Sequence, residues 1–271
     1  MGKLDRAWQL FNESFTVLNA DVEILLFPLM SGVSAILVGI GFFFPLYRGG
    51  VFESIQTGKA DWQDYAMLFA WYYANFFIGI FFNGALVACA GIRLSGGDPT
   101  VRDGLRVAVG HIGRIALWAL ISATVGIFLS SVRRRGNWIV RLLGASLEVA
   151  WSLITYMIVP VLLFEDRGIY DSIYRAEELF KDNWGEQVVG SLGLGMLSFV
   201  LCIPAFLLAA FLWPYDRPLA IIMTVCYLLI LSVVCSAVKG VFTVALYRYA
   251  TQHEVPAGFS ADLIDEALGG R

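Results

Sequence analysis

The chain has 271 residues, of which 58% are hydrophobic and only 15% charged, and its mean hydropathy is +0.72. This composition excludes a disordered or collagenous chain and an ordinary soluble domain, in which about a quarter of the residues carry charge. The 19 basic and 22 acidic residues give a net charge of -3, so there is no overall basic field to bind nucleic acid. The composition therefore predicts lipid as the surrounding solvent and main partner.

Six apolar runs are long enough to cross a bilayer, since a hydrocarbon core of about 30 Å needs about 20 apolar residues in a helix. Helices are expected because hydrocarbon offers no partner for unpaired backbone groups. The predicted fold class is an all-α polytopic membrane bundle, with one membrane domain over residues 1–251 and a polar C-terminal tail over 252–271. The expected spans are residues 24–47, 65–92, 115–132, 142–164, 187–215 and 218–240.

The polar segments before two of these spans resemble each other. RAWQLFNESF from Arg6 aligns with RAEELFKDNW from Arg175 at an offset of 169 residues, and a weaker third copy begins at Asp103. Apolar residues recur at helical spacing in both stronger copies, which predicts short amphipathic helices over residues 4–18 and 169–183 on the cytoplasmic membrane surface. The internal repeat predicts three units, each with a surface helix and two spans, a kind of duplication common in transporters.

The distribution of lysine and arginine predicts the orientation. With the N-terminus inside, the cytoplasmic segments hold eleven of these residues and the outer loops seven, so both termini are expected in the cytoplasm. Arg133, Arg134 and Arg135 oppose this arrangement because they fall outside. Two alternatives stay open: this loop contacts an acidic group outside, or the runs 115–132 and 142–164 form a shallow hairpin that does not cross fully.

Three polar residues inside the apolar runs are candidates for a cavity or a polar intramembrane site: Asn75, Asn83 and Glu148. The two asparagines lie eight residues apart and so share nearly one helix face. Their amides either fasten helices together or line a pore or substrate cavity. Glu148 is a candidate because a charge in hydrocarbon is costly. It could pair with Arg141, or be hydrated if its segment lies along the outer surface.

The run SGGDPTVRDGLR from Ser95 has the features of a phosphate-binding segment. It combines two glycines, a helix start near Thr100, and Arg102 and Arg106 one turn apart; Arg114 follows. Helix N-termini and arginines attract phosphate, so these three arginines are candidates for contact with anionic lipid headgroups. The alternative is a plain helix-capping loop without a ligand.

No catalytic set and no cofactor site can be assembled from the sequence. The four cysteines lie in apolar stretches without a C-x-x-C spacing, and the two histidines, His111 and His253, lack a second ligand at metal spacing. No metal site is expected, and an enzyme is the least expected class.

Several stretches carry a resemblance to a known family: ADVEILLFPLMSG from Ala20, FFNGALVACAGIRLSGGDPTVRDGL from Phe81, ALISATVGIF from Ala119, VPVLLFEDRG from Val159, AEELFKDNWGE from Ala176 and ALYRYATQHEVPAGF from Ala245. The chain resembles a widespread uncharacterised family of six-span bacterial and archaeal integral membrane proteins. More distantly, the VPVLLFEDRG segment is similar to the membrane domain beside some glycerophosphodiester phosphodiesterases. The resemblance implies architecture and a multi-pass position in the cytoplasmic membrane of a prokaryote. It supplies no catalytic residues.

Two function classes remain. A carrier or lipid-handling protein is favoured by the repeat and by Asn75, Asn83 and Glu148. A structural or accessory subunit, which organises the membrane, binds a partner protein or forms a homo-oligomer, is favoured by the sparse intramembrane charge and the surface helices.

Overall fold

The computed structural model describes residues 3–135, 147, 151–152, 155, 157–165, 167–182, 184–252 and 259. All regular elements in these residues are helices, which confirms the all-α prediction for the described part of the chain. Residues 157–164 are helical as well. The elements are α1 (Lys3–Ala20), the short 3-10 helix η1 (Val22–Leu25), α2 (Leu26–Arg48), α3 (Val51–Gln56), α4 (Trp62–Leu94), α5 (Val101–Gly110), α6 (Ile112–Arg135), α8 (Ile169–Asp182), α9 (Trp184–Leu212) and α10 (Arg217–Gln252).

Five helical segments of the described residues are long and apolar enough to cross a membrane. These lengths and compositions indicate a membrane protein. Eleven of the 23 residues of the predicted span 142–164 fall outside the described residues, and the other five expected spans each have a counterpart in the structure. The five segments are Val22–Arg48, Trp62–Leu94, Ile112–Ser131, Gly195–Leu212 and Arg217–Gln252.

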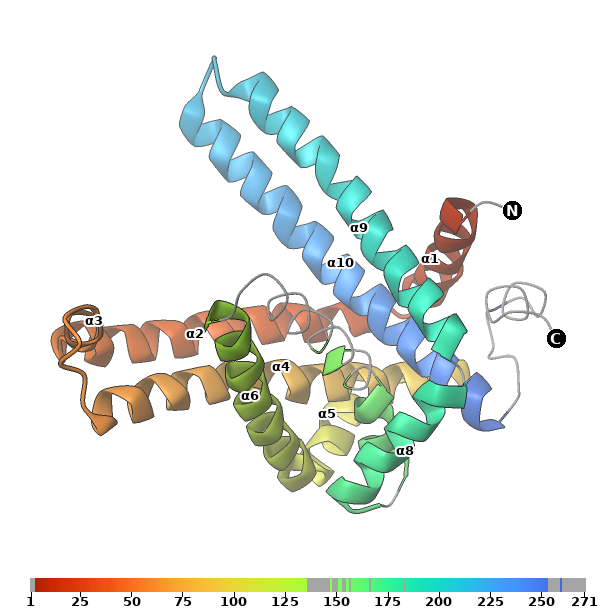
Figure 1. Cartoon of the computed structure of the whole chain (residues 1–271). Helices are drawn as coiled ribbons and strands as arrows, with labels where there is room; N and C mark the ends of the chain where they lie inside the picture. Colours follow the sequence, from red (N-terminus) through yellow and green to blue (C-terminus); the bar gives the residue numbers. More distant parts are fainter. Residues whose placement is uncertain are drawn as a thin grey trace.

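Two long helical hairpins diverge from a common base (Figure 1). In the first, α2 packs along α4, with α3 at the turn; in the second, α9 packs along α10. The second half of α10 also contacts α4, and α1 lies against both α9 and α10. The shorter helices α5 and α8 lie at the base, where the two hairpins meet.

The tip of the first hairpin depends on two glycines and one helix cap. Gly50 and Gly58 have φ angles of +67° and +69°, a left-handed conformation that side chains with a Cβ rarely adopt. After this turn, Asp61 caps α4 by accepting hydrogen bonds from the backbone N–H groups of Gln63 and Asp64, both at 3.0 Å. The Asp64 carboxylate accepts in return from the Asp61 N–H at 3.3 Å, which completes a capping box.

The buried core lies in the base rather than along the arms. Its largest fully buried side chains include Phe27 of α2, Leu86 of α4 and Trp118 of α6, together with Met157 and Ile158. Small residues bring the helices close together in this region. At Gly104 of α5, for example, a Cβ would lie 2.6 Å from the backbone oxygen of Ala85 in α4. The helices therefore pack through their backbones here, as in many membrane proteins.

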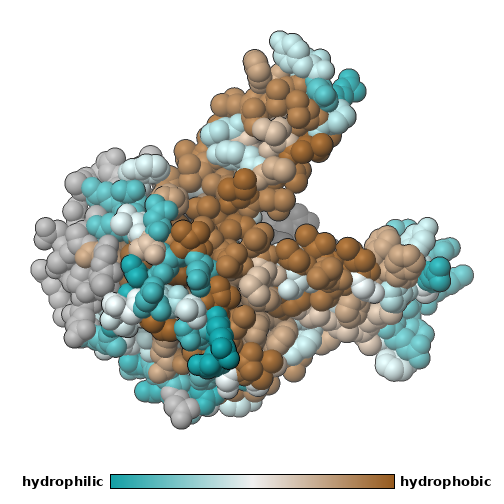
Figure 2. Space-filling model, turned by 180° about the vertical axis from the view of Figure 1, so that it is seen from behind, coloured by the Kyte–Doolittle hydropathy of each residue, from teal (hydrophilic) through white to brown (hydrophobic). Residues whose placement is uncertain are grey.

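The arms of both hairpins expose apolar side chains. Figure 2 shows hydrophobic surface along the arms and hydrophilic surface at their tips and over the base. On α2, Ile36 and Phe44 are both 61% exposed, and on α9 Phe199 is 71% exposed. Such surfaces are stable in lipid and unstable in water, which agrees with helices that cross a membrane.

Candidate functional site

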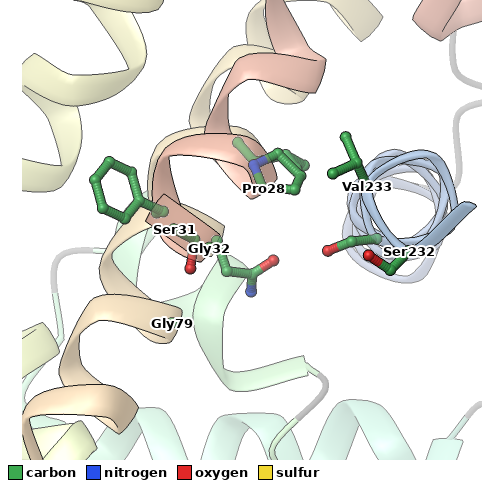
Figure 3. Close-up of a pocket in the computed structure, with 10 residues that line it drawn as sticks. Pro28, Ser31, Gly32, Gly79, Ser232 and Val233 are labelled. Atoms are coloured by element: carbon green, nitrogen blue, oxygen red, sulfur yellow. The ribbon is translucent and has the colours of Figure 1, made fainter. Parts of the chain in front are cut away.

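A cavity of about 310 Å³ lies between the two hairpins, close to the point where they separate. We call it the fork pocket. Pro28 and Ser31 lie on one side of it, and Ser232 and Val233 on the other (Figure 3). Its volume is at the lower end of the range of about 300–1,000 Å³ that is typical of small-molecule sites. It is lined by Pro28, Ser31 and Gly32 of α2, by Gly79, Phe82, Asn83 and Leu86 of α4, and by Ser232, Val233 and Ser236 of α10.

The structure separates the two predicted asparagines. Asn83 lines the fork pocket, and its exposed carboxamide has no hydrogen-bond partner among the residues that the structure describes. Asn75 lies outside the pocket, and its side-chain N–H donates to the backbone oxygen of Trp71 at 2.8 Å, within its own helix. Only Asn83 is therefore available to a molecule in the pocket.

Three serines add hydroxyl groups to the same pocket. Ser232 donates to the backbone oxygen of Leu229 at 2.8 Å. Ser31 and Ser236 have no hydrogen-bond partner within the described part of the chain. None of the three serines was predicted from the sequence as a site residue. Their signal is weak, because a serine in an apolar run is common and only the crossing of α2, α4 and α10 brings these three together.

Two glycines leave room for the fork pocket, and a third glycine allows the close helix contact that forms its closed end. A Cβ at Gly32 or at Gly79 would meet nothing within 4 Å, so both positions open into the pocket. A Cβ at Gly240 of α10 would instead overlap the side chain of Leu86. The pocket is thus open where the hairpins diverge and is closed where α10 rests on α4.

A second polar cluster, centred on Glu165, lies at the base. Its side chain is 15% exposed, and it follows the buried helical residues 157–163 and the exposed Phe164. The carboxylate pairs with the Nε of Arg167 at 2.7 Å and of Arg175 at 3.5 Å, and it accepts a hydrogen bond from the Tyr247 hydroxyl at 3.1 Å. Its backbone oxygen accepts from Arg114 at 3.5 Å. Glu165 therefore joins α6, α8 and α10, which is a structural role. Glu165 was not among the site residues predicted from the sequence, although an acid directly after a fully apolar run is a usable signal.

The N-terminus of α5 binds carboxylates of the protein itself. Thr100 and Asp103 form a capping box, in which the Asp103 carboxylate accepts from the Thr100 N–H at 3.1 Å and from its hydroxyl at 2.6 Å. These hydrogen bonds lower the pKa of Asp103 below its ordinary value of 3.8. Glu23, far away in sequence, accepts from the Val101 N–H at 2.9 Å. The helix start predicted near Thr100 is present, but two carboxylates already lie where a phosphate was expected to bind.

The three predicted headgroup arginines differ in their surroundings. Arg102 and Arg106 are exposed on α5. Arg114 is partly buried and donates to Glu165 as described above. Arg102 and Arg106 are accessible to a membrane surface, whereas Arg114 holds the base together.

Glu148, the third cavity candidate, lies outside the described residues, so its role stays a prediction. Arg133, Arg134 and Arg135 form the last turn of α6, beyond its candidate span. In the described ranges no group of three His, Cys, Asp or Glu residues is placed to hold a metal ion.

The comparisons with known proteins give one match. A family model, described as a family of unknown function (DUF6159), matches residues 63–258. No curated protein and no solved structure matches the chain significantly. The matched region includes α4 and α10, which form two walls of the fork pocket, and Glu165 with its partners. Because the match covers more than half of the chain, this protein belongs to the DUF6159 family of unknown function.

Proposed function

We propose that this protein is a non-enzymatic membrane protein that binds an amphiphile, a lipid or a lipid-like small molecule, in the fork pocket, and that it handles or transports this molecule. The observation that carries the proposal is the pocket itself, in which hydrogen-bonding groups without partners lie between apolar helices. Such groups are unfavourable in hydrocarbon unless water or a ligand binds them. The ten lining residues include no acid, histidine or cysteine, so they favour binding over catalysis.

The proposed membrane position is six-span, in the cytoplasmic membrane of a prokaryote, with both termini in the cytoplasm. Three shorter helices directly precede candidate spans, α1 before α2, α5 before α6 and α8 before α9, which supports three repeated units with surface helices on the inner face. Basic residues at the base, such as Arg93 and Arg175, agree with the cytoplasmic side.

The distances along the helices support a pocket near the inner membrane boundary. At a rise of 1.5 Å per residue, Ser31 lies about 26 Å from Arg48 at the tip of α2, and Asn83 about 32 Å from Trp62 at the start of α4. A hydrocarbon core is about 30 Å thick. If the tips reach the outer boundary, the pocket lies in the inner leaflet, where the polar part of a lipid meets its chains.

The test is extraction of the protein with native lipid in polymer discs, followed by mass spectrometry of the lipids that remain after extensive washing. The substitution Gly79→Leu fills the pocket, and Gly39→Leu is the matched control because its Cβ also meets nothing within 4 Å but lies outside the lining. A lipid or small molecule retained by the natural protein and by Gly39→Leu, and lost from Gly79→Leu, supports the proposal. Equal retention by all three proteins contradicts it.

A second candidate is an accessory subunit that organises the membrane or binds a partner helix. It is favoured by the exposed aromatic side chains of α9, where Phe199, Phe206 and Phe211 are 71%, 65% and 68% exposed. Phe199 and Phe206 lie seven residues apart and so share nearly one helical face, which a second helix could cover. A stoichiometric protein partner, or a second copy of the chain, in the same discs would support this function.

A further inference from the structure

We infer that the fork pocket binds an uncharged, hydrogen-bonding part of its ligand, such as the hydroxyl and ester oxygens of a diacylglycerol, while the apolar chains of the ligand lie between the two hairpins. This inference rests on the proposed function and specifies its ligand class.

First, the fork pocket has uncharged polar groups, which favour an uncharged ligand group. Its polar groups are one carboxamide and three hydroxyls, and none of the ten lining residues is charged. Asn83 can both donate and accept, and the hydroxyls of Ser31 and Ser236 can do the same. An ionised headgroup placed here would lose hydration without gaining a counter-charge, which is costly at membrane depth. A hydroxyl or an ester oxygen of a ligand can instead form hydrogen bonds with the uncharged carboxamide and hydroxyl groups of the pocket.

The walls beyond the pocket carry the second step. On α10, Leu229, Val225 and Ile222 continue the face of Ser236 toward the tip, at spacings of seven, eleven and fourteen residues. These three side chains are exposed and apolar. Polarity thus falls sharply from the pocket toward the hairpin tips.

On α2 the same change occurs. Ile36 and Phe43 follow Gly32 at spacings of four and eleven residues, and both are exposed. A small polar solute would match only the pocket, whereas a molecule with a polar end and long apolar chains matches the whole fork.

Lys239 is the nearby cation that would favour a different ligand class, an anionic lipid. It follows Ser236 by three residues on α10 and is exposed, but it is not among the lining residues and it makes an interaction of its own. An anionic lipid whose phosphate reached Lys239 would be the competing ligand, and the test below separates the two.

The experiment uses the full chain in phosphatidylcholine nanodiscs and measures binding by native mass spectrometry. Diacylglycerol and phosphatidic acid with identical acyl chains are titrated separately, because they differ only in the charged phosphate. Three variants accompany the natural protein. Asn83→Leu removes the pocket amide at nearly constant size, Asn75→Leu is its control on the same helix, and Lys239→Gln removes the nearby cation.

We expect a single diacylglycerol adduct at lower lipid concentration than for phosphatidic acid. Asn83→Leu should weaken this adduct about tenfold, the effect of losing one or two hydrogen bonds, and Asn75→Leu should not change it. Tighter binding of phosphatidic acid that is lost in Lys239→Gln would overturn the inference and leave the proposed function intact. Binding of neither lipid, together with unchanged lipid retention in Gly79→Leu, would overturn both.

Discussion

Gly240 of α10 rests on Leu86 of α4 so closely that a Cβ at position 240 would overlap the Leu86 side chain. Leu86 is only 1% exposed, so its side chain is enclosed by protein. This contact fixes the point at which the two hairpins cross, and the fork pocket begins directly beside it because Leu86 is also a lining residue. The absence of one methyl group therefore sets the geometry of the pocket.

Gly240→Ala should lower the free energy of unfolding by about 1–3 kcal/mol, the usual effect of overpacking a filled core. The measurement is the thermal unfolding midpoint of the purified protein in detergent. Gly39→Ala is the control, since its Cβ meets nothing within 4 Å and it gains the same helix propensity. Equal midpoints for the two variants would show that the crossing is not tight at this position.

Glu165→Gln should lower the free energy of unfolding by about 1–3 kcal/mol, the usual effect of losing hydrogen bonds to a charged group, because Arg167 and Arg175 are 50% and 25% exposed and the pair is not fully buried. The substitution removes the carboxylate that pairs with Arg167 and leaves Arg175 paired with Glu178 alone. Glu178→Gln is the matched control: Glu178 pairs with the same Arg175 at 2.6 Å, but its side chain is 60% exposed. An exposed pair contributes only about 0–1 kcal/mol. Similar losses in the two variants, measured by thermal or denaturant unfolding, would contradict a structural role for the Glu165 cluster.

The contribution of Asp21 to the free energy of unfolding should fall as pH rises. Its side chain is 8% exposed and pairs with Arg93 at 3.2 Å, but burial raises the pKa of Asp21 more than Arg93 lowers it. Because the folded state has the higher pKa, the stability that this group contributes is complete below its ordinary value of 3.8 and is lost as pH rises through the folded-state pKa. The unfolding midpoint of the natural protein, relative to that of Asp21→Asn, should therefore increase on acidification.

The contribution of Asp103 to the free energy of unfolding should change with pH in the opposite direction, rising as pH rises. Its pKa is lowered by the hydrogen bonds from Thr100, so its contribution is present above 3.8 and is lost as pH falls through the lower folded-state value. The midpoint of the natural protein relative to Asp103→Asn should decrease on acidification. Measuring both pairs of proteins between about pH 7 and about pH 3 checks each sign, and two slopes of the same sign would contradict one of the assignments.

Arg102→Gln with Arg106→Gln should weaken the retention of anionic lipid by about 1 kcal/mol per arginine, the usual contribution of a basic residue at a membrane surface. Arg114→Gln should leave lipid retention unchanged and lower the unfolding midpoint, because Arg114 binds the Glu165 carbonyl. Lipid exchange between nanodiscs of mixed composition measures the first effect. The headgroup assignment fails if the Arg114 variant loses as much anionic lipid as the double variant.

The long helices were predictable from hydropathy, but their continuation into the base was not. The predicted span 218–240 lies in α10, which continues to Gln252. The added segment contains Val241 and Val244, whose side chains are buried by protein. Hydropathy measures only how apolar a segment is, so it cannot distinguish burial in lipid from burial against another helix.

The candidate site was predictable in part. Asn83 is visible in the sequence because an amide in an apolar run needs a partner. Ser31 and Ser236 were missed since their importance depends on how three helices cross. The start of α5 was predicted from the sequence. That a carboxylate already binds its N–H groups was not, because Glu23 comes from a segment 78 residues before Val101. Contacts between residues distant in sequence decide which polar groups have a hydrogen-bond partner within the protein and which do not.

The most direct test of the account is a cryo-EM structure of the protein in native-lipid polymer discs, at a resolution that shows side chains and ordered lipid. The account predicts elongated density that begins beside Asn83 and Ser236 in the fork pocket and extends between the hairpins toward their tips. Hairpins that come together and leave no room at the pocket, or a protein helix that fills the fork, would contradict it.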